Sequence, residues 1–237
     1  MKFGITQSFD CSYLPGREER LLVYAESDDQ QAVHYSQLIQ VGFRRSGEQI
    51  YRPHCQSCHA CQSVRIPVNT FAPTKSQKRI INRNAHFTVH VSQQPKESYY
   101  PLYDAYITER HQDGSMYPPN RDQFNSFILC QWKAPIFIEA YDGDRLIAVA
   151  VTDDIENRNN HGALSALYTF FHPDYQQHSL GTWMILMQIA TAETLEKPFV
   201  YLGYFVDGCQ KMSYKQQFRP FEQFIGDQWV RFDKKPT

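Results

Sequence analysis

The fold is decided at Pro135-Ile136-Phe137-Ile138-Glu139-Ala140-Tyr141-Asp142-Gly143-Asp144-Arg145-Leu146-Ile147-Ala148-Val149-Ala150-Val151-Thr152. Two apolar runs flank an Asp-Gly step, a strong short-range signal for a β-hairpin. Working outward, helices are expected at 98–111 and 120–132, strands at 163–171, 199–205 and 229–232, and a helix at 179–195 capped by Ser179. A polar loop with Asn157, Asn159 and Asn160 separates the second and third strands. This order predicts an α+β domain over residues 96–237.

The first half of the chain predicts a smaller α+β domain over residues 1–95. Strands are expected at 21–26, 64–68 and 86–92, and a basic helix at 75–82. Another helix should begin at caps Asp28 and Asp29 and stop at Gly42. Pro95 is expected to mark a hinge, so we place the domain boundary near residues 93–97.

Composition excludes several classes of protein. The chain has 237 residues, of which 42% are hydrophobic and 14% aromatic, so it is not a disordered chain. The longest apolar runs, such as 146–151, fall well below the roughly 20 residues that span a bilayer. The first residues carry one cation and no apolar segment, so no signal peptide is expected. We therefore expect a cytoplasmic protein without a membrane partner.

Charge is unevenly distributed along the sequence. The chain has a net charge of −1, yet the window 44–90 carries +7 and the remainder −8. The cations of this window are Arg44, Arg45, Arg52, Arg65, Lys75, Lys78, Arg79 and Arg83. Such a window is typical of a docking surface for a polyanion on an otherwise acidic body, and a solvated surface is the alternative.

Three cysteines stand in a Cys55-x-x-Cys58-x-x-Cys61 spacing, with Cys11 as a further candidate ligand. In a cytosolic protein this spacing favours metal or redox chemistry over a disulfide framework. An iron–sulfur cluster, tetrahedral zinc and a reduced thiol cluster that packs the loop all remain open.

Longer strings resemble the arginyl-tRNA–protein transferase family. The first half carries Tyr51-Arg52-Pro53-His54-Cys55 and Val64-Arg65-Ile66-Pro67-Val68. The second half carries Tyr201-Leu202-Gly203-Tyr204 and Lys211-Met212-Ser213-Tyr214-Lys215. The short chain and the cysteine spacing are most similar to the bacterial leucyltransferase branch. This resemblance implies transfer of leucine from leucyl-tRNA to proteins that begin with Asp or Glu, which marks them for N-degron (N-end rule) degradation, with no DNA partner.

The order of elements in the second half also resembles the GNAT acyltransferase fold. In GNAT enzymes the turn before a helix holds the pyrophosphate of coenzyme A; here Gly181 fits, while Trp183 occupies the place of a small residue. A coenzyme-A-dependent acetyltransferase is therefore the alternative enzyme. A metal-containing nucleic-acid-binding module without activity is the third hypothesis.

Site residues follow from the chemistry that the resemblance implies. Aminoacyl-tRNA is already an activated ester, so the transfer itself requires no cofactor. Candidate catalytic residues are Glu139, Tyr168, Tyr201 and Tyr204, and the alternative for each is a residue of the core or of the cleft wall. Candidate tRNA contacts are Lys75, Arg83, Lys211 and Lys215, interleaved in part with tyrosines that can stack on bases. The acceptor carboxylate requires a cation, and the candidates are Arg65, Lys78 and Arg79.

Overall fold

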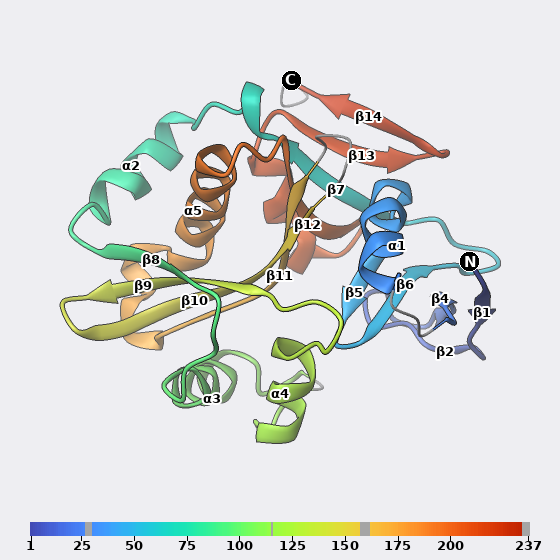
Figure 1. The fold of residues 1–237 in the computed structure, drawn as a ribbon, viewed down its shortest axis with the longest axis horizontal. Helices are drawn as coiled ribbons and strands as arrows, with labels where there is room; N and C mark the ends of the chain where they lie inside the picture. Colours follow the sequence, from blue (N-terminus) through green and yellow to red (C-terminus); the bar gives the residue numbers. More distant parts are fainter. Residues whose placement is uncertain (27–29, 115, 157–161, 234–237) are drawn as a thin grey trace.

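The computed structural model describes residues 1–26, 30–114, 116–156 and 162–233 (Figure 1). Its largest element is a mixed sheet in the order β14-β13-β7-β12-β11-β10-β9-β8. Every neighbouring pair is antiparallel except β11 and β12, which run parallel. The strands are β7 (Cys61–Pro67), β8 (Thr88–Ser92), β9 (Ile136–Asp142), β10 (Arg145–Ile155), β11 (Ala163–Phe171), β12 (Phe199–Val206), β13 (Phe221–Ile225) and β14 (Gln228–Phe232).

The predicted hairpin is confirmed as β9 and β10. Gly143 has a φ of 57°, a left-handed conformation that glycine adopts without steric cost. Side chains alternate between the two faces, and both faces are buried. Ile138 and Ala150 pack toward α5 (Leu180–Thr194), whereas Phe137 and Val149 pack toward α3 (Tyr99–Arg110).

Helices cover both faces of this sheet (Figure 1). On one face α5 packs across the central strands, and α2 (Lys75–Arg83) packs against α5. On the other face lie α3 and α4 (Arg121–Ile128). Short 3-10 segments are η1 (Ile39–Val41), η2 (Val68–Thr70), η3 (Pro173–His178) and η4 (Gln210–Gln217). None of the helices in the described ranges has the length and apolar character needed to cross a membrane.

A second, smaller sheet lies near the N-terminus, in the order β1-β4-β6-β5. Its strands are β1 (Phe3–Ile5), β4 (Leu21–Tyr24), β5 (Arg44–Ser46) and β6 (Gln49–Pro53). Helix α1 (Gln31–Leu38) packs with it in a cluster that includes Tyr35 and Ile50. A two-residue ladder joins β2 (Phe9–Asp10) to β3 (Glu18–Glu19).

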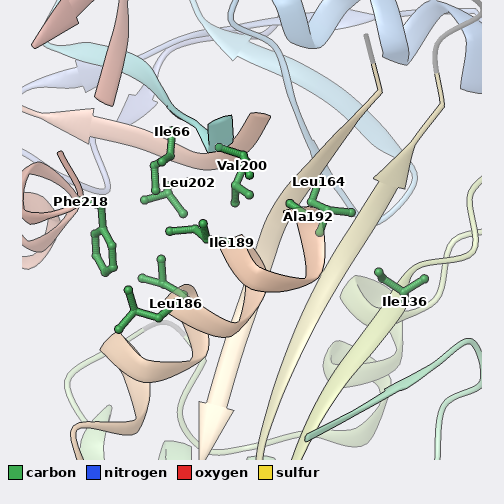
Figure 2. Close-up of a cluster of buried hydrophobic side chains, with 11 residues drawn as sticks. Ile66, Ile136, Leu164, Leu186, Ile189, Ala192, Val200, Leu202 and Phe218 are labelled. Carbon is green, nitrogen blue, oxygen red and sulfur yellow. The ribbon is translucent and has the colours of Figure 1, made fainter. Parts of the chain in front are cut away.

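Strands from both sides of the expected boundary at 93–97 form the large sheet. Strand β7 lies between β12 and β13, and β8 pairs with β9. In Figure 2, Ile66 of β7 lies in the same apolar cluster as Leu186 and Ile189 of α5. The two halves of the sequence therefore share a core.

Some local expectations differ from the structure. Ser179 has a left-handed φ of 52° and its side chain makes no capping hydrogen bond, although α5 begins at the next residue as expected. Strands β1, β2, β3, β5, β6 and β13 were not among the predicted elements. The expected caps Asp28 and Asp29 and the loop residues Asn157, Asn159 and Asn160 lie outside the described residues.

Candidate active site

A pocket of about 780 Å³ opens where β11 and β12 separate. The two strands pair only from Ala163 to Ser165 and from Phe199 to Tyr201, and then they diverge. The walls come from β11, β12, α3, α5, η4 and the first-half strands β5 and β6. Several tyrosines line it, namely Tyr13, Tyr51, Tyr106, Tyr168, Tyr204 and Tyr214.

The pocket is lined by cations and, within the described residues, by no carboxylate. The basic residues are Arg44, Arg45, His111, Lys211 and Lys215. Arg45 is neutralised by a bidentate pair with Asp153, at 2.6 and 2.9 Å. The remaining positive charge makes the pocket suitable for an anionic ligand.

Two buried cations bond to the backbone of the separated strands. The Nη2 of Arg44 donates to the carbonyl of Ala166 at 2.6 Å, and the Nζ of Lys215 donates to the carbonyl of Tyr204. Buried carbonyls need a partner, and these side chains supply one where no neighbouring strand does. Burial lowers the pKa of Lys215 to about 7, and the nearby positive charge of Arg44 acts in the same sense.

The tyrosine hydroxyls of the pocket stay protonated at neutral pH. Burial raises the pKa of Tyr168, Tyr106 and Tyr214 above the ordinary value, and that of Tyr204 well above it. Tyr204 donates its hydroxyl to the carbonyl of Gly42 at 2.9 Å, with the carbonyl of Tyr51 at 3.2 Å. Tyr204 therefore connects the large sheet to the N-terminal sheet at the pocket wall.

Of the expected catalytic residues, Tyr168 and Tyr204 line the pocket, and Glu139 and Tyr201 do not. Glu139 is on the face of β9 that packs against α3. Its carboxylate accepts hydrogen bonds from Tyr99, from Lys96 at 2.7 Å and from Tyr141 at 3.1 Å. Glu139 therefore lies outside the pocket, bonded to side chains on and beside α3.

Tyr201 and Arg65 belong to a separate cluster at β7 and β14. The Arg65 guanidinium lies between the rings of Phe199 and Trp229, 3.8 and 4.0 Å from their centroids. It pairs with Glu222 at 2.6 Å and donates to Tyr201 at 3.3 Å. Arg65 is therefore already paired with a carboxylate of its own chain, outside the pocket expected to read the acceptor.

The expected tRNA contacts fall into two environments. Lys75 and Arg83 are exposed on α2, outside the pocket, and Arg83 donates to the carbonyl of Gln177. Lys78 and Arg79, which were expected to bind the acceptor carboxylate, are exposed on the same helix and also lie outside the pocket. Lys211 is exposed and lines the pocket. Lys215 also lines the pocket but is only 4% exposed, and its role as a tRNA contact stays a prediction.

The four cysteines near the N-terminal sheet are free thiols in one neighbourhood. Burial raises the pKa of Cys61 to about 12, with further increases from the Glu19 carboxylate and from the neighbouring Cys11, Cys55 and Cys58. In the part of the chain that the structure describes, no three Cys, His, Asp or Glu side chains are arranged to hold a metal ion. A metal centre on these cysteines stays a prediction from the sequence.

Sequence reasoning counted Arg44 only as part of the charged window, and it missed Tyr13, Tyr51 and His111. Arg44 follows Phe43 in a two-arginine step between apolar segments. This position, directly after a buried aromatic residue, is the local sequence feature that could indicate a buried cation. The residues that surround Arg44 are distant in sequence, such as Ala166.

Comparison with known proteins places these features in a family. The model described as "Arginine-tRNA-protein transferase, N terminus" matches residues 9–79, and its C-terminal counterpart matches residues 98–225. These matches lie on either side of residues 93–97.

Named relatives resemble the chain over its whole length. A protein of Pseudoalteromonas atlantica named aspartate/glutamate leucyltransferase is 52% identical over 235 residues, covering 99% of each chain. A protein of the same name from Pseudomonas aeruginosa is 47% identical, covering 97% of this chain and 96% of the relative.

The fold alone has a solved neighbour. It is the C-terminal domain of a putative lysylphosphatidylglycerol synthetase from Agrobacterium fabrum, with a TM-score of 0.50 and 11% identity. The alignment covers 69% of this chain and 58% of that chain. With both halves matched by family models and with full-length relatives about half identical, the chain belongs to the arginine-tRNA-protein transferase family.

Proposed function

We propose that this protein moves leucine from leucyl-tRNA to the amino terminus of proteins that begin with Asp or Glu. The observation that carries the proposal is the full-length similarity to relatives named aspartate/glutamate leucyltransferase. The product would carry a destabilising N-terminal leucine, as expected for an N-degron function in the cytoplasm.

The chemistry makes modest demands on the protein. The α-amine nitrogen of the acceptor forms a bond to the ester carbonyl carbon of leucyl-tRNA, and the bond from that carbon to the terminal ribose oxygen breaks. The amine loses a proton and the ribose oxygen gains one. An α-amine with a reference pKa near ~8 has a usable neutral fraction at pH 7, so alignment and oxyanion stabilisation are the main tasks.

The pocket between β11 and β12 supports this use. Its size accommodates an aminoacylated nucleotide, and its tyrosine rings offer stacking surfaces for single-stranded bases. Protonated hydroxyls such as that of Tyr168 are hydrogen-bond donors suited to a developing oxyanion. We also propose that this part of the chain is GNAT-like, because β11 and β12 separate beside α5.

The exposed cations extend this site toward the body of the tRNA. Lys211 lines the pocket, and the four cations of α2 are solvent-exposed. Phosphate contacts of this kind position a nucleic acid and carry little sequence information. We assign Lys75, Lys78, Arg79 and Arg83 to tRNA docking.

Trp183 does not argue against coenzyme A in the way its position in the sequence implied. Its side chain is 3% exposed and packs in the core beside Phe87, so the indole does not project into the solvent at the start of α5. Trp183 therefore does not exclude acetyltransferase activity, which is tested by an assay with acetyl-coenzyme A.

The test supplies donors and acceptors separately. Peptides beginning with Asp, Glu, Asn or Gln are incubated with leucyl-tRNA, arginyl-tRNA or acetyl-coenzyme A, and the products are read by mass spectrometry. We expect one added leucine on Asp- and Glu-led peptides only. Transfer of arginine alone would contradict the assignment of the donor, and acetylation would contradict the assignment of the reaction class.

A further inference from the structure

Arg44 is a buried cation without a counterion. Its side chain lines the pocket, and the residue is only 7% exposed. Its Nη2 bonds to the carbonyl of Ala166, but its Nη1 is buried with no hydrogen-bond partner among the described residues. No carboxylate in those same residues forms an ion pair with it, in contrast to neighbouring Arg45. Burying an uncompensated charge is costly, so this site is incomplete without an anion.

The backbone of β12 is shaped to admit this guanidinium. Gly203 has a φ of 87°, and a Cβ at that position would lie 2.7 Å from the Nη1 of Arg44. The pairing of β12 with β7 shifts register between Tyr201 and Gly203, an irregularity typical of strands beside active sites. The unpartnered nitrogen is thus held against a strand position that only glycine leaves open.

The surroundings favour a small anion over a nucleotide phosphate. The Arg44 side chain is almost fully enclosed, whereas Lys211 and Tyr214 in the same pocket are exposed. An exposed lysine suits a phosphate on the bulky backbone of tRNA. A buried guanidinium suits a single planar carboxylate that can accept a charge-assisted hydrogen bond.

We propose that Arg44 binds the side-chain carboxylate of the acceptor's first residue and so selects Asp and Glu. The inference rests on the proposed function and deepens it. It moves recognition of the acceptor from Arg65, Lys78 and Arg79 to a residue inside the pocket. The bound carboxylate supplies the missing counterion inside the pocket, which the second buried cation, Lys215, also lines.

The experiment compares Arg44→Gln and Arg44→Lys with the parent protein. Gln removes the charge while keeping an N–H donor for the Ala166 carbonyl, and Lys keeps the charge while losing the planar fork. Each protein is assayed with leucyl-tRNA and with peptides led by Asp, Glu, Asn or Gln. The matched control is Arg52→Gln, on the adjacent strand β6 and outside the pocket lining.

For Arg44→Gln we expect kcat/KM on Asp- and Glu-led peptides to fall by about ten- to a hundredfold. The Asp-over-Asn preference should fall toward one, while tRNA affinity and its salt dependence stay at the parent values. Arg44→Lys should retain part of the Asp-over-Asn preference with a raised KM. Arg52→Gln should behave as the parent.

Three outcomes would overturn the inference. An unchanged Asp-over-Asn preference in Arg44→Gln would remove the role in acceptor choice. A loss of tRNA affinity with a shallower salt slope would assign Arg44 to a phosphate instead. Equal losses on all peptides, with a lowered melting temperature, would make Arg44 purely structural. If the parent itself adds no leucine to Asp-led peptides, the proposed function fails rather than this inference.

A second measurement does not depend on a variant folding. In the parent protein without tRNA, an Asp-led dipeptide should raise the melting temperature more than its Asn-led isostere, because only the former supplies a counterion. Equal effects of the two dipeptides would contradict the carboxylate site.

Discussion

Arg45 and Asp153 form an ion pair in which both side chains are fully shielded from solvent. Substituting one partner leaves the other charge buried and unpaired. We therefore expect Arg45→Met to lower the free energy of unfolding by about 3–5 kcal/mol, measured by urea denaturation. The double variant Arg45→Met/Asp153→Leu should recover most of this loss, because it removes both charges.

The matched control is Arg121→Met, which breaks an ion pair with Glu97 whose side chains are 50% and 93% exposed. An exposed pair contributes about 0–1 kcal/mol, so the control should unfold near the parent midpoint. A loss of stability in Arg121→Met as large as that in Arg45→Met would contradict the role of burial.

Lys215 links stability to pH. Its folded pKa of about 7 lies below the ordinary lysine value, so between these two values the unfolded chain binds the additional proton. The parent should therefore gain stability relative to Lys215→Met as pH rises from 7 to 10, by at most about 1.4 kcal/mol per pH unit. Below pH 7 the difference should level off.

Chemical denaturation at several pH values measures this difference. The control is Gln217→Met in the same 3-10 segment, which changes no ionisable side chain. A difference between the parent and Lys215→Met that stays constant from pH 6 to pH 10 would show that the ammonium is not destabilised by burial.

At the scale of elements, α2 presents its cations to solvent while its opposite side packs on α5. The helix begins at a capping box, in which Thr74 accepts from the Gln77 backbone and the Gln77 side chain accepts from the backbone of Thr74. Substituting Lys78 or Arg79 with Gln should weaken tRNA binding and make its salt slope shallower by about one unit for each bound phosphate that the variant releases.

These α2 variants should leave the Asp-over-Asn preference at the parent value, which separates them from Arg44. Affinity titrations at several salt concentrations give the slope. Arg231→Gln on β14 is the matched exposed control and should change neither quantity. Unchanged salt slopes in every α2 variant would show that the cations of this helix are solvated and make no contact with tRNA phosphates.

Elements with a strong local pattern could be predicted from the sequence. The Asp142-Gly143 step and the alternating apolar residues around it identified β9 and β10, and β11 has the predicted bounds. Strand β5 has the sequence Arg-Arg-Ser and no apolar alternation, so only its pairing with β6 makes it a strand. Glu139 was placed on the correct strand, but packing of α3 determines what its carboxylate meets.

At the scale of the whole molecule, β7 makes one folding unit of the two sequence halves. A chain cut at residue 95 would deprive β12 and β13 of β7 and deprive β9 of β8. We expect the intact protein to unfold in one transition, with coincident near- and far-ultraviolet circular dichroism. Fragments 1–95 and 96–237 should each lack near-ultraviolet signal until they are mixed. Two separate unfolding transitions in the intact chain would contradict the expectation that the two halves unfold as one cooperative unit.

The site is likewise a property of the whole molecule, which is why the sequence revealed so little of it. Arg44 reaches Ala166, which is 122 positions away, and Tyr204 reaches Gly42 across 162 positions. Local patterns show neither contact. Residue types and family strings identified Tyr168, Tyr204 and Lys211 as candidates, whereas the burial of Lys215 and the pairing of Arg65 depend on tertiary packing.

The parting of β11 from β12 has an evolutionary consequence. Arg44 and Lys215 each donate a hydrogen bond to a main-chain carbonyl there. The side chains that make the pocket positive therefore also satisfy the backbone of the separated strands. A descendant that gave up leucine transfer would still need those bonds, because losing either one would leave a buried carbonyl unmatched. Hydrogen-bond donors at these two positions should therefore persist in the lineage longer than the reaction itself, so that a relative can keep the pocket after losing the activity.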